Sequence, residues 1–332
     1  MNELKQITLV DDEIVKSKKC ITKKKAGIIY ENIKDFRKNK IYYLLTVPAL
    51  LFFAVFHYLP MVGIVLAFKN YKFDDGIFGS EWVGLQNFKF FFLSEYALTT
   101  TFNTLFLNFM FILFGTLCQV CFALLLNEIK EKFFKKIFQS FMLFPYFISW
   151  VVISNFVYSL FSSDFGVINN ILKDFGMNPV NWYSTASYWP TILVFTYIWK
   201  WTGYGVIIYL AVIAGIDSEL YESSCIDGAN KFQQIKHITI PHLTNIVIIL
   251  TLLAVGRIFY GDFGMIYGII QDNGVLFKTT DVIDTYVFRA LRGTGDIGMA
   301  SAVGLYQSVV GFALVILSNM LAKKYNKDAA LF

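Results

Sequence analysis

The chain has 332 residues, of which 56% are apolar, 18% aromatic and only 16% charged. Soluble globular domains carry about 25% charged residues, so this composition excludes an ordinary soluble domain and indicates a protein embedded in a membrane. The formal net charge is +5, and the four cysteines are divided between apolar and polar segments, which does not indicate a disulfide framework.

Residues 1–40 are polar and rich in lysine, and we interpret them as a cytoplasmic basic N-terminal region. The apolar segment that follows is longer than a signal-peptide core of about 7–15 residues, so we expect it to remain attached as a membrane helix. The lysines could bind anionic lipid headgroups, or they could belong to a mobile tail whose charge only sets the orientation of the chain.

Apolar runs predict an all-α membrane protein with six transmembrane helices in the domain 41–322, followed by a cytoplasmic tail at 323–332. Each run has at least 20 residues, enough to cross a hydrocarbon core of about 30 Å as a helix. The runs are continuous and lack the alternation of a transmembrane β-barrel. The predicted spans are 42–68, 101–127, 137–161, 188–214, 244–266 and 298–322.

Polar and aromatic residues inside the spans are candidates for a transport path. A charge at the centre of a membrane helix costs about 2.5–3.5 kcal/mol, so Lys200 and Arg257 should face water or the bundle interior. Nearby aromatic rings could stack on a sugar while polar groups bind its hydroxyls. Alternatively, the two charges pair with carboxylates, the tryptophans form an interfacial belt and the amides bridge helices. The path candidates are Asn108, Gln119, Trp199, Lys200, Trp201, Tyr204, Arg257, Tyr260 and Asp262.

The polar segment 215–243, between the fourth and fifth spans, predicts two short helices. Asp217 can cap a first helix at 219–226, because its side-chain oxygen can accept from free backbone donors. Gly228 can then break that helix by taking a left-handed conformation. The preceding Asp227 can cap the second helix, where its negative charge also suits the helix dipole.

The second helix is expected to run from Ala229 to about Ile240, with Pro241 in the first turn of the fifth span. Its residues are predicted to separate into an apolar side and a polar side. The apolar side has Phe232, Ile235 and Ile238, and the polar side has Lys231, Gln234 and Lys236. The product would be a helical elbow on the membrane surface.

Lysine and arginine predict the orientation of the chain. Of the 29 basic residues, 20 lie before the first span, after the last span, or in the second-to-third and fourth-to-fifth connections, and seven lie in the other loops. Because cytoplasmic loops carry the excess of basic residues, both termini, the turn 130–136 and the segment 215–243 are predicted to be cytoplasmic. Residues 281–291 have apolar residues at helical spacing and predict a short helix on the outer face.

The run ESSCIDGANKFQQIKHITIPHL at 222–243 resembles the cytoplasmic coupling motif of ABC importer permeases. That motif has an acidic residue, two small residues, Asp-Gly-Ala, and then spaced apolar residues with a proline. Serines stand at 223 and 224, where the family usually has alanines. The matching positions are Glu222, Asp227, Gly228, Ala229, Ile235, Ile238, Pro241 and Leu243.

The resemblance implies a type I ABC importer permease fold in which the elbow docks into a groove on a separate ATPase. Ala229, Phe232 and Ile235 would be anchors, and Glu222 would hold the elbow by a salt bridge or a helix cap, without a catalytic role. The competing interpretation is an ordinary amphipathic connection between two spans. The coupling candidates are Glu222, Asp227, Gly228, Ala229, Phe232, Ile235 and Pro241.

The chain has no GxxxxGK[ST] loop, so ATP and Mg²⁺ are expected on the partner ATPase, with no cofactor or metal on this chain. Stretches at 47–73, 79–88, 279–289 and 301–319 are similar to the first permease of complex-carbohydrate importers of the maltose-type group. This resemblance implies a bacterial plasma-membrane location, a second related permease, two ATPase subunits, an extracellular solute-binding protein and an oligosaccharide substrate. The alternatives are an ABC importer for a peptide or polyamine and an ion-coupled carrier. An enzyme is not indicated, because no set of nucleophile, base and oxyanion donors is recognisable.

Overall fold

The computed structural model describes residues 38–325. They belong to two units, which divide after Gly63 and are considered separately. Most of the predicted basic N-terminal region and residues 326–332 of the tail lie outside the described residues.

The first unit contains α2 (Lys40–Phe53), the π-helix η1 (Ala54–Tyr58) and the beginning of the 3₁₀-helix η2 (Leu59–Phe68). With the rest of η2 these form one apolar run, Lys40–Phe68, of 29 residues that is long enough to cross a membrane. The helix type changes just before Pro60, a residue that cannot donate the backbone hydrogen bond of an α-helix.

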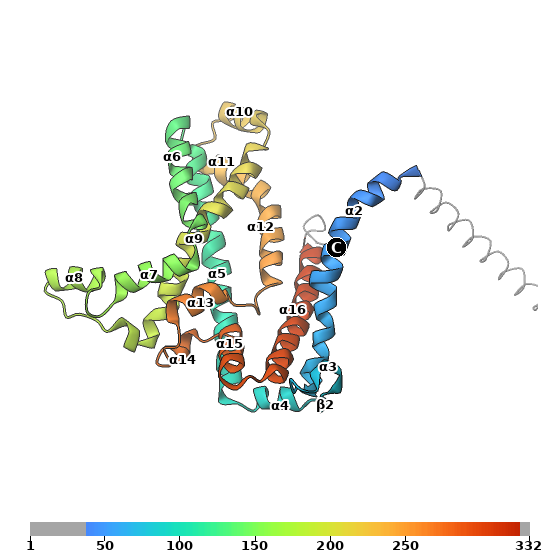
Figure 1. The fold of residues 1–332 in the computed structure, drawn as a ribbon. Helices are drawn as coiled ribbons and strands as arrows, with labels where there is room; N and C mark the ends of the chain where they lie inside the picture. Colours follow the sequence, from blue (N-terminus) through green and yellow to red (C-terminus); the bar gives the residue numbers. More distant parts are fainter. Residues whose placement is uncertain (1–37, 326–332) are drawn as a thin grey trace, which may run out of the picture. The chain divides into compact units, whose positions relative to one another are not determined.

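The second unit is almost entirely helical, with a single two-stranded antiparallel ribbon in which Lys69 lies opposite Trp82 among the described residues. Figure 1 shows α10 and α11 at one end of this unit and α14 and α15 at the other. Its elements in chain order are β1 (Lys69–Asn70), α3 (Gly76–Gly79), β2 (Glu81–Trp82), α4 (Gln86–Phe92), α5 (Glu95–Glu128), α6 (Lys132–Leu143), η3 (Phe144–Phe147), α7 (Trp150–Phe161), α8 (Val167–Asp174), η4 (Trp182–Ser184), η5 (Ala186–Tyr188), α9 (Trp189–Ala214), α10 (Ser218–Ile226), α11 (Lys231–Gln234), η6 (Ile235–Thr239), α12 (Ile240–Val255), α13 (Phe263–Ile270), α14 (Phe277–Thr280), α15 (Ile283–Thr294) and α16 (Ile297–Tyr325).

Four of the six predicted spans correspond to continuous apolar helical runs that could cross a membrane. The predicted all-α class is therefore confirmed, and the short helix expected at 281–291 is present as α15. The four runs are Lys40–Phe68, Tyr96–Glu128, Ala186–Ala214 and Ile297–Lys324.

The third and fifth spans differ from the prediction. The third is broken, because Lys132–Phe147 and Trp150–Phe161 meet at 99°. The fifth begins earlier than predicted, as the continuous helical run Lys231–Val255, and it ends before residue 256 instead of reaching 266. Hydropathy alone misses the break in the third span, because the residues around it remain apolar, whereas Arg257 and Asp262 interrupt the apolar run at the end of the fifth.

The core of the second unit is built where α9 packs along α5. One cluster joins these helices to α7 and α13 and includes the fully buried Trp189 and Met265. A second joins them to α12 through Tyr209 and Leu243. Close packing is permitted by small residues, and at Gly203 an added Cβ would lie only 1.9 Å from the carbonyl oxygen of Met142.

Candidate coupling elbow and transport path

The first elbow helix is α10, and it begins where the sequence predicts. The Asp217 carboxylate accepts a hydrogen bond from the backbone N–H of Glu219 at 3.0 Å and caps the helix. Asp227 ends the helix, and Gly228 follows with φ of +79°, a conformation that glycine adopts without strain. The Gly228 turn therefore sets the angle between the two arms of the elbow.

The second arm is capped by Asn230 and not by Asp227, so that prediction is wrong. The Asn230 side chain accepts from the Gln233 N–H at 2.9 Å, and the Gln233 side chain accepts from the Asn230 N–H at 2.8 Å. This reciprocal pair is a capping box. Asp227 still belongs to the end of α10, because Gly228 must turn the chain before a new helix can begin.

Gln234 holds the two arms together, although the sequence places it on the polar side of the elbow. The residue is only 3% exposed. Its amide nitrogen donates to the Ser224 hydroxyl at 2.9 Å and lies 3.3 Å from the Tyr221 carbonyl oxygen. The Tyr221 hydroxyl in turn lies 2.9 Å from the Thr239 hydroxyl. Ser224, a departure from the usual alanine, thus contributes a contact between the arms.

The second arm continues into the fifth span without a break. Pro241 lies in the first turn of α12, as predicted, and α12 is joined to α11 and η6 in one continuous run, Lys231–Val255. A proline donates no backbone hydrogen bond, and the wider π-turns of η6 immediately precede it. Any displacement of the elbow would therefore be applied directly to α12.

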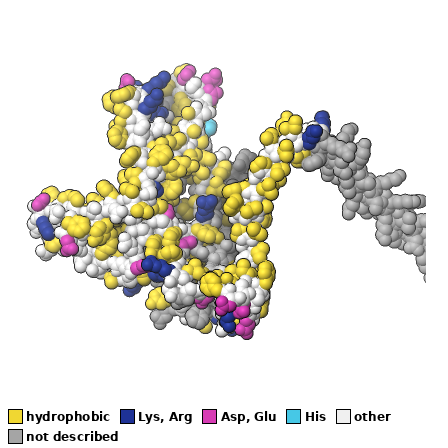
Figure 2. Space-filling view, in the orientation of Figure 1, with side chains coloured by type: hydrophobic (Ala, Val, Ile, Leu, Met, Phe, Trp, Pro, Cys, Tyr) yellow, Lys and Arg dark blue, Asp and Glu magenta, His cyan; other side chains and the backbone are white. Residues whose placement is uncertain are grey.

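The outer surface of the elbow offers apolar and acidic groups to a partner. Phe232 is 73% exposed and Ile226 is 87% exposed, while Ile235 is half-buried. Glu222 is exposed, and its carboxylate has no hydrogen bond or ion pair within residues 38–325, so neither the predicted salt bridge nor the predicted cap is formed there. In Figure 2 acidic and basic side chains gather at the end of the unit that carries α6 and α10.

A shallow hollow of about 300 Å³ lies in the bend of the elbow. Gly228 and the half-buried Ala229 form part of its wall, and a larger residue at either position would fill space that a partner could enter. The remaining lining residues are Ser224, Asp227, Gln233, Gln234, His237 and Ile238.

Lys200, predicted to face the path or a carboxylate, lies at the break in the third span. It is 6% exposed, and its ammonium donates to the carbonyl oxygens of Pro145 at 3.4 Å, Tyr146 at 3.1 Å and Ile148. The Trp150 ring lies 5.0 Å away. Lys200 therefore donates to carbonyl groups at the bend, where backbone polar groups need partners at membrane depth.

The aromatic path candidates surround Tyr146 and the outer side of α9. Trp199 is 45% exposed and stacks on Phe156 with ring centroids 6.4 Å apart. Tyr204 is also 45% exposed and stacks on Tyr146 at 4.9 Å. Trp201 contacts the same Tyr146 ring at 5.5 Å, and its buried indole N–H has no hydrogen-bond partner within residues 38–325.

Gln119 is one of two amide candidates on α5, and it bridges helices. Its side-chain nitrogen lies 3.4 Å from the carbonyl oxygen of Trp201. Gly205 gives the amide room, because an added Cβ there would lie 2.1 Å from the Gln119 side chain.

The other α5 amide, Asn108, supports the break between α12 and α13. It donates to the carbonyl oxygens of Ile258 at 2.9 Å and Tyr260 at 3.2 Å. These carbonyls lie beyond the end of α12 and have left the regular helix. Asn108 therefore has the same role at the break in the fifth span as Lys200 has in the third: it donates hydrogen bonds to backbone carbonyls at the break.

Two further side chains, absent from the predicted set, support the same break. Gln307 on α16 donates to the carbonyl oxygen of Phe259 at 2.8 Å and to the Asp284 carboxylate at 3.3 Å. Asp284 accepts from the backbone N–H of Gly261 at 2.6 Å. Burial raises the pKa of Asp284 above the usual aspartate range, while the Gly261 N–H and Gln307 act in the opposite direction.

Arg257, Tyr260 and Asp262 belong to this break and not to the middle of a helix, which corrects the predicted placement of Arg257 in the fifth span. Arg257 is exposed, and Tyr260 is 41% exposed with its hydroxyl 3.0 Å from the Ser308 hydroxyl. Asp262 caps α13 by accepting from the Met265 N–H at 3.1 Å, and it attracts the charge of Lys200. The nine candidates therefore form two groups, one at each broken span.

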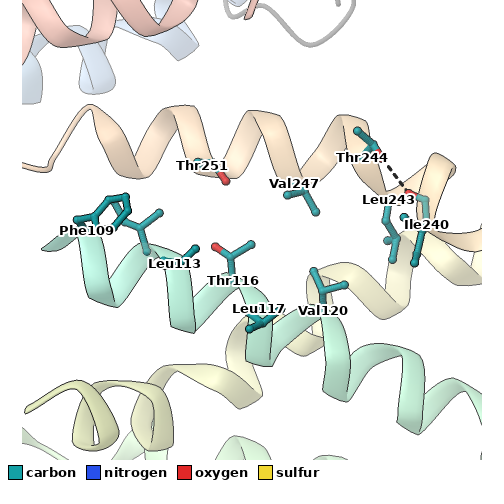
Figure 3. Close-up of a pocket in the computed structure, with 11 residues that line it drawn as sticks. Phe109, Leu113, Thr116, Leu117, Val120, Ile240, Leu243, Thr244, Val247 and Thr251 are labelled. Carbon is teal, nitrogen blue, oxygen red and sulfur yellow. Dashed lines mark hydrogen bonds between the residues drawn. The ribbon is translucent and has the colours of Figure 1, made fainter. Parts of the chain in front are cut away.

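A separate cavity of about 470 Å³ lies between α5 and α12 (Figure 3). The hydroxyl groups of Thr116, Thr244 and Thr251 are the only polar side-chain groups among its lining residues, and Thr244 already donates to Ile240. Such a lining provides few donors for sugar hydroxyls, and it does not include any of the nine candidates. The other lining residues are Phe109, Ile112, Leu113, Leu117, Val120, Ile240, Leu243 and Val247.

Comparisons with known proteins agree with this architecture. A family model described as "Binding-protein-dependent transport system inner membrane component" matches residues 119–327. Protein LplB of Bacillus subtilis (strain 168) is 36% identical over 292 residues, covering 88% of this chain and 91% of that protein. The polygalacturonan/rhamnogalacturonan transport system permease protein YteP of the same organism is 34% identical, covering 88% and 90%.

A solved structure of a bacterial ABC transporter involved in import of the acidic polysaccharide alginate contains a similar chain. The TM-score is 0.81 at 31% identity, and the match covers 88% of this chain and 98% of that one. Since the family model covers more than half of the sequence, the chain belongs to the family of binding-protein-dependent transport system inner membrane components, the permeases of ABC importers.

Proposed function

We propose that the chain is the transmembrane permease subunit of an ATP-driven ABC importer for oligosaccharides, in which it forms half of the translocation path. Family membership and the similarity to permeases named for polysaccharides and oligosaccharides support this function. The single structural observation that carries it is the two-armed elbow at 217–239, which is continuous with a membrane-spanning helix.

The coupling step is docking of the elbow onto a partner ATPase. Helix-in-groove recognition relies on a few apolar anchors with polar groups around them. The strongly exposed Phe232 suits the role of central anchor, with Ala229 and Ile235 beside it and the unpaired Glu222 carboxylate available to a basic group of the partner. Closure of the ATPase would move the elbow and, through Pro241, the continuous helix α12.

The proposal includes the rest of the importer. The partners are a second related permease, two ATPase subunits that bind ATP and Mg²⁺, and an extracellular solute-binding protein that delivers the sugar. This chain binds no cofactor and catalyses no reaction. Both of its termini and the elbow are cytoplasmic, and the chain crosses the bacterial plasma membrane several times. The uneven distribution of basic residues supports that orientation.

Docking is tested by substituting the proposed anchor. Phe232→Ala should weaken copurification of the ATPase with the permease by about tenfold or more, as expected for truncation of a central aromatic anchor. Phe141→Ala is the matched control, because Phe141 is similarly exposed, at 75%, on a different helix. Equal recovery of the ATPase with both variants would contradict docking through the elbow.

The substrate class is tested by uptake. A deletion strain should lose uptake of an oligosaccharide and recover it with the intact chain. Loss of peptide or polyamine uptake with unchanged oligosaccharide uptake would assign the importer to another solute. Uptake that persists without the ATPase subunits would indicate an ion-coupled carrier.

A further inference from the structure

The break between α12 and α13, residues 256–262, is a rigid platform. Its backbone groups are held by side chains from three different helices: Asn108 of α5, Asp284 of α15 and Gln307 of α16. Four backbone polar groups of the platform are satisfied in this way. Broken helices in a membrane need such partners, and once provided they hold the break in one conformation.

The rigid platform presents an arginine. The Arg257 side chain is exposed, and among residues 38–325 its guanidinium makes no hydrogen bond and no ion pair. The two carboxylates nearest the platform are already used, since Asp262 caps α13 and Asp284 binds Gly261 and Gln307. A guanidinium facing lipid would be strongly unfavourable, so Arg257 should face a water-filled space or a bound anion.

Tyr260 completes the exposed surface of the platform. Its ring is 41% exposed, and its hydroxyl is fixed by the Ser308 hydroxyl of α16 at 3.0 Å. The ring also lies against Gly311, whose added Cβ would be 3.9 Å from it. The phenol is thus held in place, and the exposed part of the ring can contact the apolar face of a sugar.

Guanidinium and carboxylate form bidentate, charge-assisted hydrogen bonds, which are among the strongest polar contacts in proteins. A neutral sugar would leave the Arg257 charge unneutralised, whereas an acidic sugar supplies its missing partner and a ring for Tyr260. We infer that Arg257 and Tyr260 form a subsite that binds the carboxylate-bearing unit of an acidic oligosaccharide. The inference rests on the proposed function and specifies its substrate class.

The test compares an acidic substrate with its neutral counterpart. The complete importer, with its own binding protein, is reconstituted in vesicles and supplied with short oligogalacturonates or with their methyl esters, which lack the negative charge. Arg257→Gln should lower uptake of the acid form by about tenfold or more, as expected for loss of hydrogen bonds to a charged group. Arg257→Lys should have an intermediate effect, because it keeps the charge and loses the two-pronged geometry.

Control measurements distinguish recognition of the acidic sugar from loss of folded protein and from loss of oligosaccharide import as a whole. Arg292→Gln, which removes an arginine on α15 that pairs with Asp272, should leave the preference for the acid form unchanged. The amount of each variant in the membrane is measured in parallel. Equal losses for acid and ester in Arg257→Gln, or a wild type that imports only neutral oligosaccharides, would overturn the inference while preserving the proposed function. A wild type that imports no oligosaccharide at all would refute the proposed function itself.

Discussion

Gly203 of α9 provides a sharp test of the packing that supports the broken third span. An added Cβ would lie 1.9 Å from the Met142 carbonyl oxygen and 2.3 Å from its carbonyl carbon, and both are backbone atoms that no side-chain rotation can move. Ordinary contact begins at 3.4 Å, so α6 would have to move away from α9 by about 1.5 Å. We expect Gly203→Ala to destabilise the purified chain by about 1–3 kcal/mol, which is typical of overpacking.

Two further glycine-to-alanine variants calibrate this result. At Gly205 the added Cβ meets the flexible Gln119 side chain, which can move aside, so the loss should be smaller. At Gly304 of α16 no atom of the described chain lies within 4 Å, and alanine should be neutral or stabilising by up to about 1 kcal/mol through helix propensity. Thermal unfolding in detergent, followed by size-exclusion chromatography, measures all three. Similar melting temperatures for Gly203→Ala and Gly304→Ala would refute the packing argument.

Three other substitutions test the elbow and the platform. Gln234→Leu should free the two arms, so that amides of 218–226 exchange hydrogen faster, and unchanged exchange would contradict the role of Gln234. Gly228→Val, strained at φ of +79° by about 1–2 kcal/mol, should reduce ATPase copurification, whereas Gly176→Val, equally strained at φ of +72°, should not. Asn108→Leu should lower the melting temperature by orphaning two carbonyls, about 1–4 kcal/mol in total, and Asn155→Leu, which loses only a bond to its own helix, should have little effect.

The long spans could be predicted because a membrane helix needs only length and continuous apolarity, and both are local properties. The breaks could not. The residues around 145 remain apolar, and although Arg257 and Asp262 lie near 258, the groups that satisfy the carbonyls at both breaks are remote in sequence, such as Lys200 and Asn108. Recognition of these residues as polar groups within spans was possible, but their partners depend on tertiary packing.

The elbow likewise combines features that local sequence determines with a contact that depends on tertiary packing. The Asp217 cap and the Gly228 turn follow from local chemistry and were predictable. The spacing of Asn230 and Gln233 also fits a capping box, so the sequence contained a signal for Asn230 as the cap of the second helix, although Asp227 was predicted. The burial of Gln234 could not be read, because it depends on how α10 folds back on α11.

The measurement that tests the central claim most directly is oligosaccharide uptake by the reconstituted importer as a function of ATP. The chain is combined in vesicles with its partner permease, its ATPase and a sugar-loaded binding protein. The account predicts uptake that requires ATP hydrolysis and that falls when the elbow anchor is removed by Phe232→Ala. ATP-independent uptake, or full ATP-driven uptake by a variant whose elbow no longer binds the ATPase, would contradict it.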